Sequence, residues 1–329
     1  MLDTSTVQAR NEELMRKTGI SLAATIYRRP ATIVLRGELG AGKTTFVQGL
    51  AAGLGITERI TSPTYALEQR YGGETLSHID LYRLTPVQAT EFFRTLDPFP
   101  GLRVIEWSDR TAIEPDIEID IAETGEGRSI AVSFRDIAVP MDSEVDAWME
   151  LVTLPEHIRK HVRKVAEVAE KVADAVELQG RIVRKKALRA AALSHDLLRF
   201  VDFASMTGDD VYSPAPHETD TWITMKKSYG TPHEVAAQKF LEEHGYPDIG
   251  HIVLTHRGYG QSKVPETIEQ LILAYSDKRA IIDSVVTLDE RFDDFIVRYG
   301  KGKESDDARA WRAEIKLIET KLFPDGAPF

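Results

Sequence analysis

A glycine-rich stretch at residues 37–45 constrains the fold of this chain more than any other feature. Two glycines flank four residues and are followed by Lys-Thr. This is the spacing of a phosphate-binding loop, whose backbone N–H groups and following helix N-terminus hold phosphate oxygens. The residues expected to bind nucleotide phosphates are Gly37, Glu38, Leu39, Gly40, Ala41, Gly42, Lys43, Thr44 and Thr45.

The residues around this loop are those that the motif requires. Residues 11–27 predict a helix that leads into the first strand, and the apolar, β-branched residues 31–35 predict that strand, buried and parallel. Apolar residues then recur at helical spacing over 46–54. In such a setting a lysine at position 43 reaches the β- and γ-phosphates and the hydroxyl of Thr44 binds Mg²⁺.

Two acidic residues end predicted strands further along. Asp80 lies near the end of the alternating run 76–83, and Glu106 lies near the end of the run 102–107. Carboxylates at strand ends beside a phosphate loop are what Mg²⁺ and an attacking water need. Each acid alone is equally consistent with a surface residue at a strand terminus, but the presence of two favours a site.

Composition limits the remaining possibilities. A length of 329 residues suggests two domains, and a net charge of −11 argues against a generally basic, nucleic-acid-binding surface. The absence of cysteine excludes disulfides, cysteine zinc sites and thiol catalysis. There is no apolar run long enough for a bilayer, and residues 1–10 are too polar for a signal peptide. We therefore expect a cytoplasmic protein that does not bind membranes.

Four motifs in the first half occur together in one known family. They are Gly-Glu-Leu-Gly-Ala-Gly-Lys-Thr-Thr-Phe (37–46), Ser-Pro-Thr-Tyr (62–65), His-Ile-Asp-Leu-Tyr-Arg (78–83) and Ile-Glu-Trp (105–107). In this order they resemble TsaE, the small ATPase of bacterial tRNA threonylcarbamoyladenosine biosynthesis. The resemblance extends over about residues 10–135 and includes the alternating residues 117–134, which predict two closing strands.

The resemblance implies an α/β P-loop NTPase fold, a mostly parallel sheet with flanking helices, that hydrolyses ATP with Mg²⁺. It implies that Lys43 and Thr44 hold phosphates and metal, and that Asp80 supports the metal or a switch loop. Glu106 would position or activate water, and Trp107 would shape the nucleotide pocket. TsaE-like proteins dock onto the TsaB and TsaD proteins, so these are the expected partners and no direct tRNA binding is expected. A small-molecule kinase is disfavoured, because the motifs leave little room for an acceptor-binding lid.

The second half has a different pattern. Residues 135–150 show no periodicity and contain Pro140 and several acids, so we place domains at 1–140 and 148–329. Helical periodicity follows, interrupted by an irregular stretch at 203–230, which predicts a long loop. A capping box is expected at residues 231–234, and Pro265 is expected to open a later helix.

Histidines and aspartates lie on successive predicted helices of this half. Imidazole and carboxylate suit iron, manganese or zinc, and magnesium at an oxygen-rich position. An aspartate beside a histidine can bridge two metals while the histidine binds one. A lone histidine on an apolar helix edge is more often a hydrogen-bonded core residue than a ligand, and only the whole set favours a metal site. The candidate ligands are His161, His195, Asp196, His233, His256 and Asp277.

Four segments carry a second resemblance, to the HD superfamily of metal-dependent phosphohydrolases. They are residues 161–166, 193–196, 233–237 and 275–279. The resemblance implies an all-α HD-type domain with one or two divalent metals (Fe, Mn or Mg), a catalytic Asp196, and a small phosphorylated substrate. Many members have lysine shortly after His-Asp, where this chain has Arg199, which would then bind phosphate.

The sequence therefore predicts a bifunctional protein, a TsaE-like ATP hydrolase fused to an HD-type phosphohydrolase. The alternative keeps the ATPase and makes the HD domain a metal- or nucleotide-binding regulatory module without turnover. The departure at Arg199 leaves both interpretations open.

Overall fold

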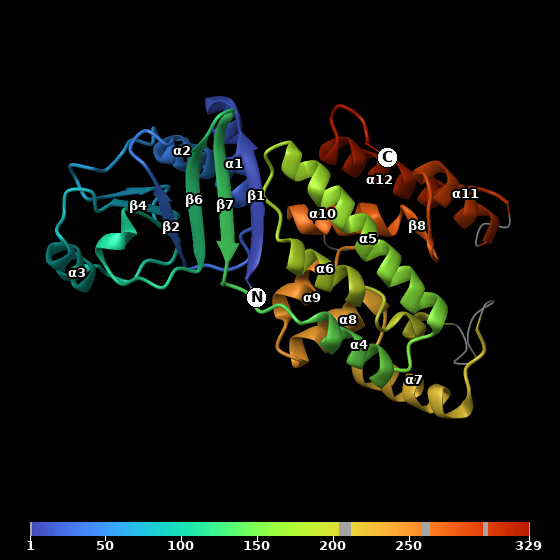
Figure 1. The fold of residues 1–329 in the computed structure, drawn as a ribbon. Helices are drawn as coiled ribbons and strands as arrows, with labels where there is room; N and C mark the ends of the chain where they lie inside the picture. Colours follow the sequence, from blue (N-terminus) through green and yellow to red (C-terminus); the bar gives the residue numbers. More distant parts are fainter. Residues whose placement is uncertain (1, 204–211, 258–263, 299–301, 329) are drawn as a thin grey trace. The chain divides into compact units, whose positions relative to one another are not determined.

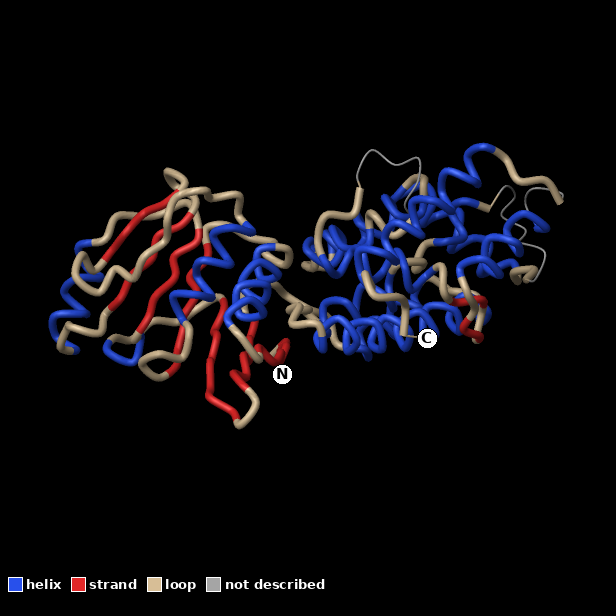
Figure 2. Tube along the Cα trace, turned by 90° about the horizontal axis from the view of Figure 1, so that it is seen from above, coloured by secondary structure: helices blue, strands red, loops and turns tan. Residues whose placement is uncertain are grey.

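The computed structural model describes residues 2–203, 212–257, 264–298 and 302–328. Backbone contacts divide the chain into two compact units (Figures 1 and 2). The first unit comprises Met1–Ile137 with Val176–Arg184, and the second comprises Ala138–Ala175 with Lys185–Phe329. The boundaries 1–140 and 148–329 stay a prediction, and the assignment of Val176–Arg184 to the first unit was not expected.

The first unit is built on a mixed sheet of seven strands within the described residues. Its order is β1 (Asp3–Ala9), β7 (Gly127–Phe134), β6 (Ile117–Thr124), β2 (Ala31–Gly37), β5 (Leu102–Glu106), β4 (Leu76–Asp80) and β3 (Glu68–Tyr71). The four strands from β6 to β4 are parallel to one another, and β1, β7 and β3 join antiparallel. The predicted α/β class is confirmed, with a parallel centre. The strand β1 precedes the one that we expected to be first.

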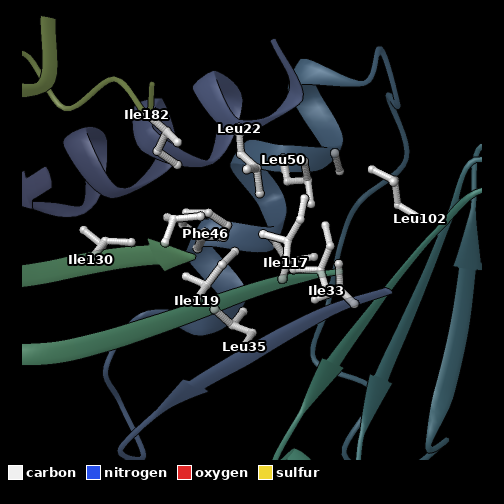
Figure 3. Packing of buried hydrophobic residues seen from close by; sticks show 14 of the residues in the cluster. Leu22, Ile33, Leu35, Phe46, Leu50, Leu102, Ile117, Ile119, Ile130 and Ile182 are labelled. Atoms are coloured by element: carbon white, nitrogen blue, oxygen red, sulfur yellow. The ribbon is translucent and has the colours of Figure 1, made fainter. Parts of the chain in front are cut away.

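Two helices, α1 (Glu12–Ala23) and α2 (Lys43–Gly53), pack over one face of this sheet. Figure 3 shows Leu22, Phe46 and Leu50 of these helices against isoleucines and leucines of the central strands. The two helix backbones approach closely, because a Cβ at Gly49 would lie 2.1 Å from the carbonyl oxygen of Arg16. The helix α3 (Pro86–Thr95) packs with a separate apolar cluster around Ile79 and Ile105.

The second unit is helical. Its helices are α4 (Asp142–Leu151), α5 (Glu156–Leu178, of which the last three residues belong to the first unit), α6 (Lys185–Ser194), α7 (Pro216–Tyr229), α8 (His233–Glu243), α9 (Pro247–Val253), α10 (Ile268–Asp277), α11 (Leu288–Arg298) and α12 (Asp306–Leu322). The predicted helical class is confirmed, with the addition of a short hairpin, β8 (Ala280–Ile281) and β9 (Ser284–Val285). Among the described residues, no helix has the length and apolarity needed to cross a membrane.

Three local predictions in this unit were wrong. The stretch expected to be a long loop contains α7, whose start is stabilised by the Glu218 carboxylate accepting from the backbone N–H of Ala215 at 2.6 Å; residues 204–211 lie outside the described part. The helix α8 has Pro232 at its N-cap, and this residue makes no side-chain hydrogen bond, so the expected capping box does not form. The helix α10 begins after Thr267, whose hydroxyl accepts from the backbone of Gln270, and not at Pro265.

Candidate functional sites

The glycine-rich loop connects the end of β2 to the first residue of α2. Gly40 and Gly42 have φ values of +84° and +100°, a region that residues with a side chain rarely adopt. Gly42 is the N-cap of α2, and Lys43 is the first helical residue. The helix therefore begins directly at the loop, with Thr44 and Thr45 half-buried in its first turn. This is the local geometry of an anion site at a helix N-terminus.

The Lys43 side chain is almost fully buried, with 6% exposed. Its ammonium donates hydrogen bonds to the carbonyl oxygens of Gly37 at 2.8 Å and Glu38 at 3.0 Å. It lies 4.0 Å from a carboxylate oxygen of Glu106 and 4.7 Å from the centre of the Trp107 ring. A fixed positive charge is thus held between the loop and the end of β5, where it would neutralise a bound phosphate.

The two strand-end acids lie side by side. Asp80 and Glu106 are register partners on the parallel strands β4 and β5, and each is 3% exposed. One oxygen of Glu106 lies 2.9 Å from Nε2 of the fully buried His78, and the other oxygen faces Lys43. The histidine therefore fixes the orientation of the carboxylate. We did not assign a role to His78 from the sequence, although it lies two residues before Asp80 and so on the same face of β4.

Asp80 holds the loop that precedes β3. Its Oδ2 accepts hydrogen bonds from the hydroxyls of Thr64 at 2.5 Å and Ser62 at 3.3 Å, and its Oδ1 accepts from the backbone N–H of Tyr82 at 2.9 Å. Both hydroxyls belong to the Ser-Pro-Thr-Tyr motif. The motif loop and the strand-end acid are therefore one hydrogen-bonded assembly.

A cavity of about 470 Å³ opens beside the phosphate loop, within the size range of small-molecule sites. Trp107 contributes to its wall from a left-handed backbone position, φ +59°, that is unusual for a bulky residue. Three charged lining residues were missed by sequence reasoning: Arg36 of β2, Asp109 in the turn after β5, and Glu123 of β6. Only the sheet topology brings these three segments together. The lining residues are Arg36, Gly37, Glu38, Trp107, Asp109, Ile121, Ala122 and Glu123.

In the second unit the structure brings all six candidate metal ligands into one cluster. They come from α5, the turn after α6, the first residue of α8, the turn after α9 and the end of α10. The ring centre of His195 lies 5.5 Å from that of His161 and 4.9 Å from that of His256. The ring centre of His233 lies 5.2 Å from that of His256. Their role as ligands stays a prediction, but their convergence is a property of the fold.

One donor group consists of His161, His195 and Asp277. Oδ1 of Asp277 lies 3.0 Å from Nε2 of His161 and 3.7 Å from Nε2 of His195. The other ring nitrogen of His195, Nδ1, donates to the carbonyl oxygen of Ala192 at 2.8 Å. In the neutral ring, that hydrogen bond leaves the lone pair on Nε2, directed at the cluster.

A second donor group, His233 and His256, lies next to Asp196. Oδ1 of Asp196 is 3.0 Å from Nε2 of His233 and 3.7 Å from Nε2 of His256, while Oδ2 of Asp196 is 3.8 Å from Nε2 of His195 in the first group. Nδ1 of His256 donates to the carbonyl oxygen of Val253 at 2.7 Å, so its Nε2 also carries the lone pair. Asp196 therefore faces both donor groups, as a bridging carboxylate must.

The electrostatics of the cluster suit a divalent cation. Burial works against the charge on Asp196, but His195 and His233 outweigh it and hold the pKa of that carboxyl well below its usual range. Burial, together with the charges of His195 and His233, lowers the pKa of His256 well below its usual value. An ionised Asp196 and a neutral His256 are in the protonation states that a metal requires. At His195 and His233 burial is outweighed by the neighbouring aspartates, which raise the pKa, so a metal would displace the protons of these two rings.

Together the fold and these residues define a P-loop nucleotide-binding protein that carries a second, histidine-rich helical domain. Comparison with known proteins gives the families. Residues 9–130 match the family model described as "Threonylcarbamoyl adenosine biosynthesis protein TsaE", and residues 158–282 match the model of the HD domain. The chain belongs to the TsaE family through its first half, and its second half matches the HD domain model.

Individual relatives agree with the first match. The protein "tRNA threonylcarbamoyladenosine biosynthesis protein TsaE" of Nostoc sp. is 40% identical over 121 residues, which cover 35% of this chain and 74% of the relative. The protein of the same name from Treponema pallidum is 46% identical over 98 residues, covering 28% and 71%. A crystal structure of YdiB from Bacillus subtilis is 29% identical, covers 41% of this chain and 87% of that chain, and has a TM-score of 0.33.

Proposed function

We propose that this protein joins an ATPase of tRNA threonylcarbamoyladenosine biosynthesis, acting with TsaB and TsaD, to a metal-dependent phosphohydrolase with a small phosphorylated substrate. The observation that carries the first half is the position of Glu106. It lies at the end of a parallel strand, between the buried Lys43 and the buried His78. That position is where a residue that orients an attacking water belongs.

Each residue of the ATPase site has a separate task in this proposal. The loop amides and Lys43 bind the β- and γ-phosphates. Thr44 and Asp80 would hold Mg²⁺, whose charge neutralises the phosphates. Glu106 is fixed through one oxygen by His78 at 2.9 Å, and orients water with the other. Because Asp80 also accepts hydrogen bonds from Ser62 and Thr64, a movement of Asp80 at the metal would displace the loop that contains these two residues.

The test of the first half is ATP turnover by the full chain, alone and with a TsaB–TsaD pair. We expect the pair to stimulate turnover, and we expect tRNA alone to have no effect because the chain carries a net charge of −11. Turnover that is unaffected by the pair, in a preparation that binds ATP, would contradict the proposed partnership.

The second half of the proposal depends on the cluster around Asp196. His161, His195 and Asp277 would hold one cation and His233 and His256 another, with Asp196 shared between them. Two bound cations would clamp a phosphoryl group and lower the pKa of a bridging water. The test is elemental analysis followed by a phosphoester panel with added Mn²⁺ or Fe²⁺.

One observation favours the alternative, a regulatory module without turnover. Arg199 would bind substrate phosphate, yet its guanidinium donates to Asp202 at 3.1 Å and lies 3.2 Å from Nδ1 of His233. One guanidinium nitrogen of Arg199 therefore already contacts protein groups, where phosphate binding would require it to face the substrate. Metal and nucleotide binding without hydrolysis of any phosphoester in the panel would favour this alternative.

A further inference from the structure

The ring of His233 and its backbone are held by the same carboxylate. Oδ2 of Asp202 lies 2.6 Å from Nδ1 of His233, and Oδ1 of Asp202 accepts a hydrogen bond from the backbone N–H of His233 at 3.2 Å. Asp202 ends the short 3-10 turn Arg199–Asp202, 31 residues earlier in the chain. Because α8 begins at His233 and has no side-chain cap at Pro232, Asp202 also serves as the cap of that helix.

This contact determines which nitrogen of His233 faces the cluster as an acceptor. A carboxylate can only accept hydrogen bonds, so Nδ1 of His233 must carry a hydrogen. In the neutral ring the lone pair then lies on Nε2, which is 3.0 Å from Asp196 and 3.2 Å from Nε2 of His256. Arg199 also donates to Oδ2 of Asp202, at 3.1 Å, from a nitrogen that lies 3.2 Å from Nδ1 of His233, and so helps to hold this carboxylate in place.

His233 differs in this respect from the two other buried histidines of the cluster. His195 and His256 donate from Nδ1 to backbone carbonyls of Ala192 and Val253, which come with the turns themselves. His233 instead depends on a side chain from another element. Its orientation therefore depends on a side-chain contact that a substitution can remove.

We propose that Asp202 is the positioning residue that sets His233 as an Nε2 ligand, and so determines binding at the second of the two metal positions. The proposal rests on the metal-binding function proposed above. Glu234 also approaches Nδ1 of His233, with Oε2 at 3.1 Å. Asp202 is the stronger candidate, because it is closer, because it binds the backbone of the same residue, and because Arg199 anchors it. Outer-shell partners of this kind typically change metal affinity 10–100-fold when they are mutated.

The experiment uses the full chain with Asp202→Ala and Asp202→Asn, and Glu234→Gln as the matched neighbouring control. Mn²⁺ alone is the probe, and its stoichiometry and affinity are measured by titration calorimetry. We expect two Mn²⁺ in wild type and in Glu234→Gln. In Asp202→Ala we expect the affinity for the second Mn²⁺ to fall 10–100-fold, while the first Mn²⁺ still binds at His161, His195 and Asp277. Asp202→Asn should be intermediate, because the amide keeps one acceptor.

A second readout needs no metal. Imidazole nitrogen shifts from ¹⁵N NMR on the metal-free protein, at a pH where the ring is neutral, report the tautomer. We expect His233 to carry its hydrogen on Nδ1 in wild type and in Glu234→Gln, and to lose that preference in Asp202→Ala. If Asp202→Ala keeps both the tautomer and the second Mn²⁺, the proposal is wrong. If wild type binds no Mn²⁺, the metal function fails, and the tautomer comparison alone decides the role of Asp202.

Discussion

Arg184 and Asp136 form a bidentate ion pair in which both side chains are buried, 0% and 2% exposed. Nη1 and Nη2 of the arginine lie 2.6 Å and 2.8 Å from the two carboxylate oxygens. The guanidinium also donates to the carbonyl oxygen of Thr25 at 2.8 Å and lies 4.0 Å from the centre of the Phe134 ring. A residue from the segment after α5 therefore completes the interior of the TsaE-like unit.

This pair predicts a large effect of a single substitution. Arg184→Met would leave the carboxylate of Asp136 buried without its partner, which costs about 3–5 kcal/mol. The matched control is Arg163→Met, whose partner Asp146 is exposed and whose pair should contribute less than about 1 kcal/mol. Calorimetric unfolding of both variants measures the difference. Equal stabilities would contradict the importance of the buried pair, and Arg184→Met with Asp136→Asn should recover part of the loss.

The same segment predicts the behaviour of a truncated chain. Ile182 is fully buried in the apolar core of the first unit, where Figure 3 shows it beside Leu22 and Phe46. Residues 1–140 alone would lack this side chain, and Ile182→Ala in the full chain should cost about 2–5 kcal/mol. We expect the fragment to unfold at a lower temperature than the first unit of the intact protein. A fragment as stable as that unit would show that Val176–Arg184 is dispensable.

The parts that the sequence predicted and the parts that it missed differ in a physical way. The glycine-rich loop could be predicted because it lies between a recognisable strand and a recognisable helix. The six clustered histidines and aspartates could be predicted because they lie on successive segments with helical periodicity. The strand β1 was missed because its buried positions include Asp3 and Ser5, so it has no apolar alternation. The Ser5 hydroxyl is instead satisfied by Glu177, at 2.6 Å. Such pairs, like Asp202 with His233, join residues far apart in sequence, where no local pattern exists.

The arrangement of Glu106 and His78 predicts separate effects on binding and turnover of ATP. Glu106→Gln should lower turnover by about 10²–10⁴-fold, the usual contribution of a positioned base, with ATP affinity nearly unchanged. His78→Asn should lower turnover less, because it only loosens the carboxylate that it holds at 2.9 Å. Nucleotide titration and single-turnover hydrolysis measure the two quantities. Parallel losses of binding and turnover in Glu106→Gln would argue for a phosphate-binding role instead.

The pKa shifts in the cluster predict how metal binding depends on pH. Burial opposes the charge on His195, but Asp196 and Asp277 outweigh it and raise its pKa above the ordinary value of 6.5. A metal must displace that proton, so affinity should rise as the pH increases through 6.5 and beyond, with protons released on binding. His256, whose pKa is lowered, should release none. Mn²⁺ titrations in buffers of different ionisation enthalpy count the protons. An affinity that is constant over this range would contradict the assignment of His195 as a ligand.

The last prediction separates the two sites. Asp196 faces both donor groups, so Asp196→Ala removes a ligand from each cation and leaves their charges less neutralised. We expect this variant to purify with much less transition metal and to lose any phosphoester hydrolysis. The first unit has its own core, so Mg²⁺-ATP binding should survive, whereas Lys43→Ala should lose ATP binding and keep the metal. The controls are Asp174→Ala and Lys17→Ala, which change exposed residues of the two units. If wild type carries no metal even after reconstitution with Fe²⁺ or Mn²⁺, the metal assignment fails, and the clustered histidines are a buried hydrogen-bonded network of the core.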